Sequence, residues 1–141
     1  MPDWVGSIDK TGSPFINIAL VGPQSSQKFR ALVDTGFSGF ALLPLQAAIE
    51  VGLEPKTEIP IRFADGSRHL KSSIQAHISV ADEIKEGTVL LEPSSKEAII
   101  GMEFLREFGR VLFVHPNRGV VRLFEQEAVD SMLTARIADN P

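Results

Sequence analysis

Short apolar runs separated by turn signals recur along most of the chain, and no other feature limits its possible folds as strongly. Every second side chain between 74 and 80 is apolar, which is the period of a strand with one buried face. The Asp-Gly pair at 65–66 and the Pro and Gly of 115–119 are typical of hairpin turns. Further strands are predicted at 15–21, 28–33, 59–63, 88–91, 110–114 and 120–124. The pattern predicts a mainly β fold.

Three helices are expected within and after these strands. Residues 44–51 start at a proline and are followed by Gly52, and residues 102–108 are followed by Gly109, the usual helix stop. Residues 125–138 carry acidic residues at their start and apolar residues at helical spacing. We expect this last helix to pack on the β domain or, alternatively, on a partner chain. The predicted organisation is one domain at 1–124 and a C-terminal helical tail at 125–141.

Composition excludes several classes of function. The 141-residue chain has a formal net charge of −4 and no dense run of lysine or arginine, so nucleic acid is not an expected partner. The absence of cysteine excludes disulfides, thiolate catalysis and cysteine-ligated zinc, and the three histidines form no close metal-binding pattern. The start of the sequence has no signal-peptide pattern, and no apolar run is long enough to span a bilayer. We therefore expect a cytoplasmic protein with no metal, cofactor or membrane partner.

The stretch ALVDTGFSGF, residues 31–40, carries the strongest chemical signal. Asp34 follows an apolar strand, and Gly36 and Gly39 allow the backbone to turn sharply directly after it. Thr35 adds a hydroxyl beside the carboxylate. A carboxylate on a tight loop between two buried segments is expected to lie in surroundings dry enough to perturb its pKa. The alternative is a turn residue that caps nearby backbone amides.

Two motifs at a characteristic separation resemble those of a known family. Leu32-Val33-Asp34-Thr35-Gly36 resembles the active-site loop of retropepsin-like aspartic proteases, and Ile99-Ile100-Gly101, directly before a predicted helix, resembles the second signature of that family. Between them, Ala64-Asp65-Gly66-Ser67 lies where the family has its flap. The resemblance covers about residues 5–124 and is greatest to small prokaryotic members. It implies a closed acid-protease β-barrel, to which the predicted short helices and C-terminal helix are added.

The resemblance also implies a role for each matched residue. Asp34 would be the catalytic carboxylate, Thr35 would join the two active-site loops across a dimer axis, and Gly36 would let the backbone approach the substrate. Ile99 to Gly101 would support the loop from behind. Ala64 to Ser67 would form the tip of a flap that closes over an extended peptide.

The chemistry of this family requires two carboxylates that share one proton around a water molecule. The chain has a single Asp-Thr-Gly, and the Asp-Gly pair at 65–66 is better interpreted as a hairpin turn. The second carboxylate is therefore expected from a second copy of the chain, in a symmetric homodimer. The expected function is an aspartic endopeptidase that cleaves peptides or proteins, with an optimum at mildly acidic pH.

Two alternatives remain open at this point. The chain could be a non-catalytic binding or assembly module that keeps the barrel, or one component of a larger complex docked through residues 125–141. Some positions also depart from the retroviral pattern. Phe37 is a large residue directly after Gly36, and Met102-Glu103 replaces the arginine-containing pair that follows the second signature there.

Overall fold

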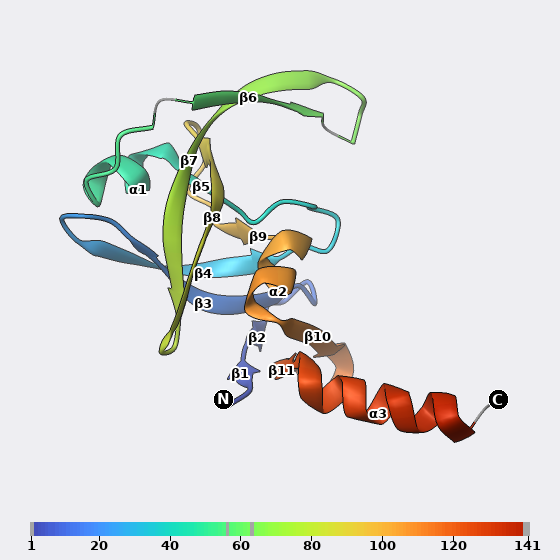
Figure 1. Ribbon diagram of the computed structural model, residues 1–141. Coiled ribbons are helices and arrows are strands. Elements are labelled where there is room, and N and C mark those ends of the chain that lie inside the picture. Colours follow the sequence, from blue (N-terminus) through green and yellow to red (C-terminus); the bar gives the residue numbers. More distant parts are fainter. Residues whose placement is uncertain (1, 56, 63, 140–141) are drawn as a thin grey trace.

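The computed structural model describes residues 2–55, 57–62 and 64–139 (Figure 1). The strands are β1 (Trp4–Val5), β2 (Ser7–Ile8), β3 (Pro14–Val21), β4 (Ser26–Val33), β5 (Ala41–Pro44), β6 (Thr57–Arg62), β7 (Arg68–Val80), β8 (Glu83–Glu92), β9 (Ile99–Ile100), β10 (Arg110–His115) and β11 (Val120–Glu125). The helices are α1 (Leu45–Glu50), α2 (Met102–Phe108), the short 3-10 helix η1 (Pro116–Arg118) and α3 (Gln126–Asp139). The three α-helices expected from the sequence are all present.

One sheet closes on itself to form the barrel. Its strand order is β2-β3-β4-β9-β5-β8-β7-β6, and an additional pairing of β3 with β7 joins the two sides. Leu20 lies opposite Ile78 in that closing pair, and the side chains of both are completely buried. Closure satisfies the edges of these strands in the paired region. The prediction of a mainly β, closed barrel with short helices and a C-terminal helix is confirmed.

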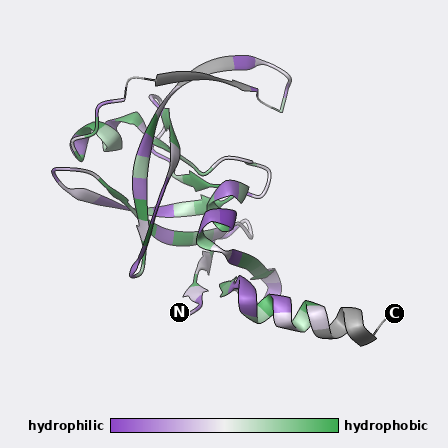
Figure 2. Ribbon diagram, viewed as in Figure 1, coloured by the Kyte–Doolittle hydropathy of each residue, from purple (hydrophilic) through white to green (hydrophobic). Residues whose placement is uncertain are grey.

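The core of the barrel follows from the alternation seen in the sequence. Along β7, Ala76, Ile78 and Val80 are buried, whereas Gln75 and His77 are exposed. Figure 2 shows the same alternation as changes of hydropathy along the barrel strands. Each large apolar side chain buried in this way stabilises the fold by about 1.5–3 kcal/mol relative to an exposed one.

A separate three-stranded sheet, in the order β1-β11-β10, lies beside the barrel and joins the two ends of the β domain. Arg110 fixes this sheet to the barrel. Its guanidinium lies 4.2 Å from the centre of the Trp4 ring and donates a hydrogen bond of 3.0 Å to the Pro2 carbonyl oxygen. It also pairs with the carboxylate of Glu83, at the start of β8, while the arginine side chain is only 1% exposed. A buried charge held in this way is expensive to leave without its partner.

The C-terminal helix α3 begins against the small sheet and then extends away from the barrel (Figure 1). The Gln126 amide donates to the Gly109 carbonyl oxygen at 3.0 Å. Farther along, Met132 and Leu133 are 66% and 54% exposed, so the expected packing on the β domain holds only for the beginning of the helix. Val129, Met132 and Leu133 share one face of the helix by their spacing, but beyond Val129 that face is exposed.

Residues 140 and 141 of the predicted tail lie outside the described residues. Among the helices described, none combines the length and apolar character needed to cross a membrane.

Replacing Arg110 by alanine is expected to lower the free energy of unfolding by about 3 kcal/mol, because Glu83 loses its partner and Trp4 loses the stacked guanidinium. Urea unfolding followed by circular dichroism measures this change. Arg106→Ala is the matched control, since the Arg106 side chain is 76% exposed in its pair with Glu103 and its removal should leave the midpoint unchanged. If the two variants lost equal free energy of unfolding, Arg110 would not hold the three-stranded sheet against the barrel.

Candidate active site

Three strands fix both ends of the loop that carries Asp34. β9 lies between β4 and β5, parallel to β4 with Val33 opposite Ile100, and antiparallel to β5 with Ala41 opposite Ile100. The loop from 34 to 40 therefore leaves on one side of β9 and returns on the other. The two signature segments, with Asp34 and Ile99 65 positions apart in sequence, meet at neighbouring strands of the barrel sheet. This juxtaposition is the one that the resemblance implied.

Asp34 is held by main-chain hydrogen bonds at the end of β4. Its amide donates to the Ile100 carbonyl oxygen at 2.9 Å, and its Oδ1 accepts a bond of 2.8 Å from the Gly36 amide. A Cβ atom at Gly36 would lie 3.1 Å from the same Oδ1, so the glycine allows this close approach. The contact is of the type expected for a turn residue, and it orients the carboxylate whatever the residue's role.

The tip of the loop is more open than the sequence suggested. Asp34 is only half-buried, and Thr35 and Gly36 are exposed. The expectation of a dry site is therefore not met by a single chain. The carboxylate and its neighbouring hydroxyl lie on a surface that another molecule can reach.

The amino end of α2 supports the far half of the loop. The Met102 amide donates to the Phe37 carbonyl oxygen at 2.8 Å, and the Glu103 amide lies 3.3 Å from the Ser38 carbonyl oxygen and 3.2 Å from that of Gly39. No side chain caps this helix. The first amides of a helix lack partners inside it, and here the carbonyl groups of the loop supply them. The supporting contact thus comes from backbone, with no arginine at position 102.

Gly101 makes this contact possible. A Cβ atom there would lie 2.2 Å from the Phe37 carbonyl oxygen and 2.6 Å from that of Gly39. These are backbone atoms, which cannot rotate away as a side chain would. Ile100 and Gly101 therefore lie directly against the loop, and Ile99 pairs with the two strands that flank it.

Phe37, the large residue that departs from the retroviral pattern, is accommodated by two glycines. A Cβ atom at Gly39 would lie 2.5 Å from the Phe37 ring, and one at Gly101 would lie 2.7 Å from it. The ring folds back over its own loop and is half-buried. Sequence reasoning missed this contact, although the Phe-x-Gly spacing at 37–39 was a signal that could have indicated it.

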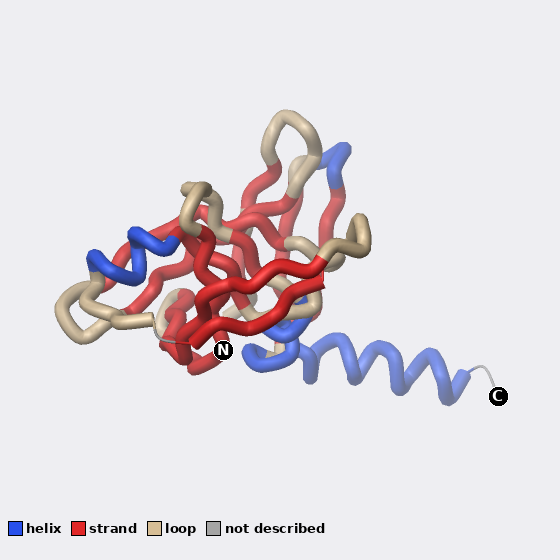
Figure 3. The backbone as a smooth tube through the Cα atoms, turned by 90° about the horizontal axis from the view of Figure 1, so that it is seen from above, coloured by secondary structure: helices blue, strands red, loops and turns tan. Residues whose placement is uncertain are grey.

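The β6–β7 hairpin is the predicted flap segment. Its turn is held by Asp65, whose Oδ1 accepts bonds of 2.9 Å and 2.6 Å from the amide and hydroxyl of Ser67. Gly66 has a φ of +87°, as the turn requires, and Ala64, Asp65 and Gly66 are exposed. In Figure 1 the hairpin arches above the β4–β5 loop, and in Figure 3 it lies across the top of the barrel. Asp65 is thus a turn residue on a different element from Asp34.

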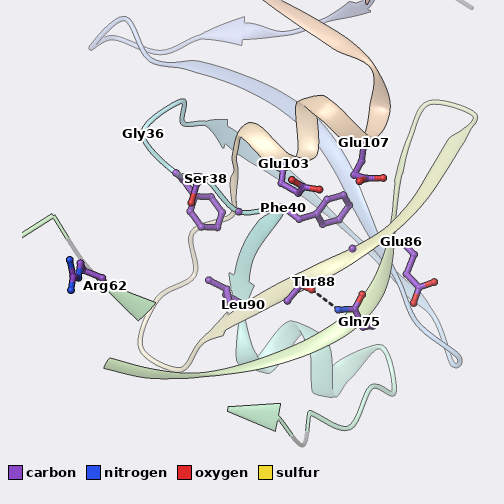
Figure 4. Close-up of a pocket in the computed structure, with 13 residues that line it drawn as sticks. Gly36, Ser38, Phe40, Arg62, Gln75, Glu86, Thr88, Leu90, Glu103 and Glu107 are labelled. Carbon is purple, nitrogen blue, oxygen red and sulfur yellow. Dashed lines mark hydrogen bonds between the residues drawn. The ribbon is translucent and has the colours of Figure 1, made fainter. Parts of the chain in front are cut away.

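A cavity of about 780 Å³ lies beside the Asp34 loop (Figure 4). Residues 36–40 and α2 border one side, β7 and β8 border another, and Arg62 at the end of β6 contributes from the hairpin. Gln75 donates a hydrogen bond to the Thr88 hydroxyl within it. Asp34 itself does not line the cavity, which begins at Gly36.

The helix α2 also brings charged groups near the loop. Arg106 donates a hydrogen bond to the Glu103 carboxylate, which keeps the pKa of Glu103 below its usual value. In residues 2–55, 57–62 and 64–139, no three histidine, aspartate or glutamate side chains are grouped so that they could hold a metal ion. Within the loop, the reactive side-chain groups are the Asp34 carboxylate and the hydroxyl groups of Thr35 and Ser38.

Comparison with known proteins defines the class of fold. No protein-family model and no curated protein matches the sequence. The crystal structure of a retropepsin-like aspartic protease from Rickettsia conorii is similar to this chain, with a TM-score of 0.60 and 17% sequence identity. The match covers 86% of this chain and 90% of that one. The chain has the retropepsin-like fold, as its two signature segments predicted.

Replacing Gly101 by alanine is expected to lower the free energy of unfolding by about 3 kcal/mol, the upper end of the range for overpacking, because backbone oxygens must move. Chemical denaturation measures the change. Gly12→Ala is the control: Gly12 has a φ of +85° but open space around it, so only the smaller conformational cost of about 1 kcal/mol applies. A Gly101→Ala protein as stable as this control would contradict the close packing of the loop on α2.

Proposed function

We propose that this protein is an aspartic endopeptidase whose active site contains Asp34 from two copies of the chain. The observation that carries the proposal is the placement of Asp34. Its carboxylate is oriented at an accessible loop tip, and the loop is fixed by β9 and α2 within a retropepsin-like fold. Alternative nucleophiles are not needed, because water is the attacking group in this chemistry.

Two Asp34 carboxylates a few ångströms apart would share one proton, since two like charges at that distance are not both stable. The ionised carboxylate removes a proton from a water molecule, and the water oxygen bonds to the carbonyl carbon of the substrate. The protonated carboxyl group gives its proton to the carbonyl oxygen. When the C–N bond breaks, the pair gives a proton to the leaving nitrogen. One hydroxyl group of the tetrahedral intermediate returns a proton to the pair as it becomes the carbonyl group of the acid product, which restores the shared-proton state.

The exposure of the loop tip supports completion of the site by a second copy. Thr35 and Gly36 are exposed in the single chain, directly beside the half-buried Asp34. Isologous contact about a two-fold axis would bring the same residues of two chains together. In that arrangement the two Thr35 hydroxyl groups link the loops, and the site becomes more shielded from water than in one chain.

The substrate would run as an extended peptide between the loop and the hairpin. Ala64, Asp65, Gly66 and Ser67 would form the flap tip, whose closure excludes water and offers backbone hydrogen bonds to the peptide. The cavity that starts at Gly36 would receive a substrate side chain on one side of the scissile bond. Ile99, Ile100 and Gly101 would keep the loop in position during this closure.

Asp34→Asn is expected to abolish peptide cleavage, with a loss of at least about a thousandfold, because the amide cannot serve as base or share a proton. The side chain keeps its shape and an oxygen for the Gly36 amide, so the fold should be retained. The measurement is incubation with a complex peptide library from about pH 4 to pH 7, with new termini identified by mass spectrometry; wild-type cleavage should be strongest at mildly acidic pH.

The companion variant Asp82→Asn tests whether the effect belongs to Asp34. Asp82 is exposed in the turn between β7 and β8 and does not line the cavity, so its replacement should leave cleavage unchanged. If wild type and Asp34→Asn produced the same termini at every pH, the protein would not be an aspartic peptidase. The non-catalytic binding module would then be the better account of the same barrel.

A further inference from the structure

The outer edge of β4 is a second feature of the barrel that the proposed peptidase function does not use. β4 pairs with β3 from Ser26 to Leu32, but it pairs with β9 only at Leu32 and Val33. In Figure 1, β9 lies only beside the end of β4 that leads into the active-site loop. Within the part of the chain that the structure describes, no strand pairs with the other edge of β4 between residues 26 and 31.

The direction of the backbone groups along this edge follows from one hydrogen bond. The Leu32 amide donates to the Ala98 carbonyl oxygen at 2.9 Å, so it faces away from β3. Residues two apart in a strand direct their N–H and C=O groups to the same edge. Lys28 and Arg30 therefore present their backbone donors and acceptors to the outer edge, as a template for another strand.

A groove runs along these backbone groups. It has a volume of about 450 Å³, with residues 27–30 of β4 on one bank and residues 96–99 on the other. A second hollow of about 530 Å³ lies on the side of β4 that pairs with β3, where Lys28, Phe29 and Arg30 line it together with residues 17–19. The outer edge itself therefore borders one groove, at residues 27–30.

The groove is cationic although the whole chain carries a net charge of −4. Lys28, Arg30 and Lys96 line it, against a single carboxylate from Glu97. Arg30 is held in place, because its guanidinium lies 4.0 Å from the centre of the Phe15 ring and donates to the Ser7 hydroxyl at 3.2 Å. Lys28 and Lys96 lie on opposite sides of the groove, so positive charge flanks the position that an added strand would occupy.

We propose that the edge of β4 at Lys28 to Arg30 binds an extended acidic peptide segment of a partner protein as an added strand. Main-chain hydrogen bonds to Lys28 and Arg30 provide the pairing, and acidic side chains of the partner meet the cations of the groove. A second copy of this chain is disfavoured as the occupant, because symmetric antiparallel pairing would bring cationic residues of the two edges together. The inference does not depend on the peptidase activity.

The test uses a seven-residue peptide of alternating Glu and Val with blocked ends, and two controls: the same peptide with Lys for Glu, and one with N-methyl groups on the amides that would face β4. Hydrogen exchange of the full-length protein is followed by NMR during titration. Exchange of the Lys28 and Arg30 amides should slow at least about tenfold with the acidic peptide and remain unchanged with either control.

Charge-reversed protein variants distinguish binding at the edge of β4 from general electrostatic attraction between the peptide and the protein. Lys28→Glu with Arg30→Glu should weaken binding of the acidic peptide about tenfold or more, whereas Lys85→Glu, an exposed site on β8 outside the groove, should change it little. Equal effects of these variants, or binding without slowed exchange at Lys28 and Arg30, would overturn the proposal. Protection of these amides that rises with protein concentration alone would identify a second copy as the occupant and overturn it equally.

Discussion

The position of β9 between β4 and β5 is the constraint on which the rest of the site depends. Two residues, Ile99 and Ile100, pair with a parallel strand on one side and an antiparallel strand on the other. The Asp34 amide donates a hydrogen bond to the Ile100 carbonyl oxygen, so the end of this short strand fixes the position of Asp34 at the end of β4. Gly101 then brings the first amides of α2 against the loop, so one continuous segment, 99–103, fixes both halves of it.

An aromatic cluster extends this support to the edge of the domain. Trp4 of β1 packs edge-on against Phe108, with ring centres 5.1 Å apart, and Phe104 lies 4.6 Å from Phe108. Phe40, the residue that ends the loop carrying Asp34, lies 5.3 Å from Phe104. The three-stranded sheet, the helix α2 and this loop therefore share one core. Disturbing Trp4 would loosen the support beneath Phe40, although the two residues are far apart in sequence.

The sequence predicted those features of the fold that short local patterns, such as a helix-ending glycine, determine. The helix α2 was predicted with the bounds that it has, since Gly109 adopts the left-handed conformation, with a φ of 61°, that ends it. The contact between the loop that carries Asp34 and the segment 99–101 could be predicted because each is a short pattern with a close-approach glycine. By contrast, β1 and β2 have two residues each, and only pairing with β11 and β3 makes them strands. The exposure of Met132 and Leu133 in α3 was not predicted either, because helical spacing alone does not show whether another surface covers the helix.

A shared active site would need Asp34 from both copies of the chain, and no property of a single chain can show this requirement. Mixing wild-type protein with increasing amounts of Asp34→Asn, under conditions that let subunits exchange, tests this directly. If every site requires two intact carboxylates, the activity per total protein falls as the square of the wild-type fraction. A linear fall, the result for sites that each use one chain, would contradict the shared active site.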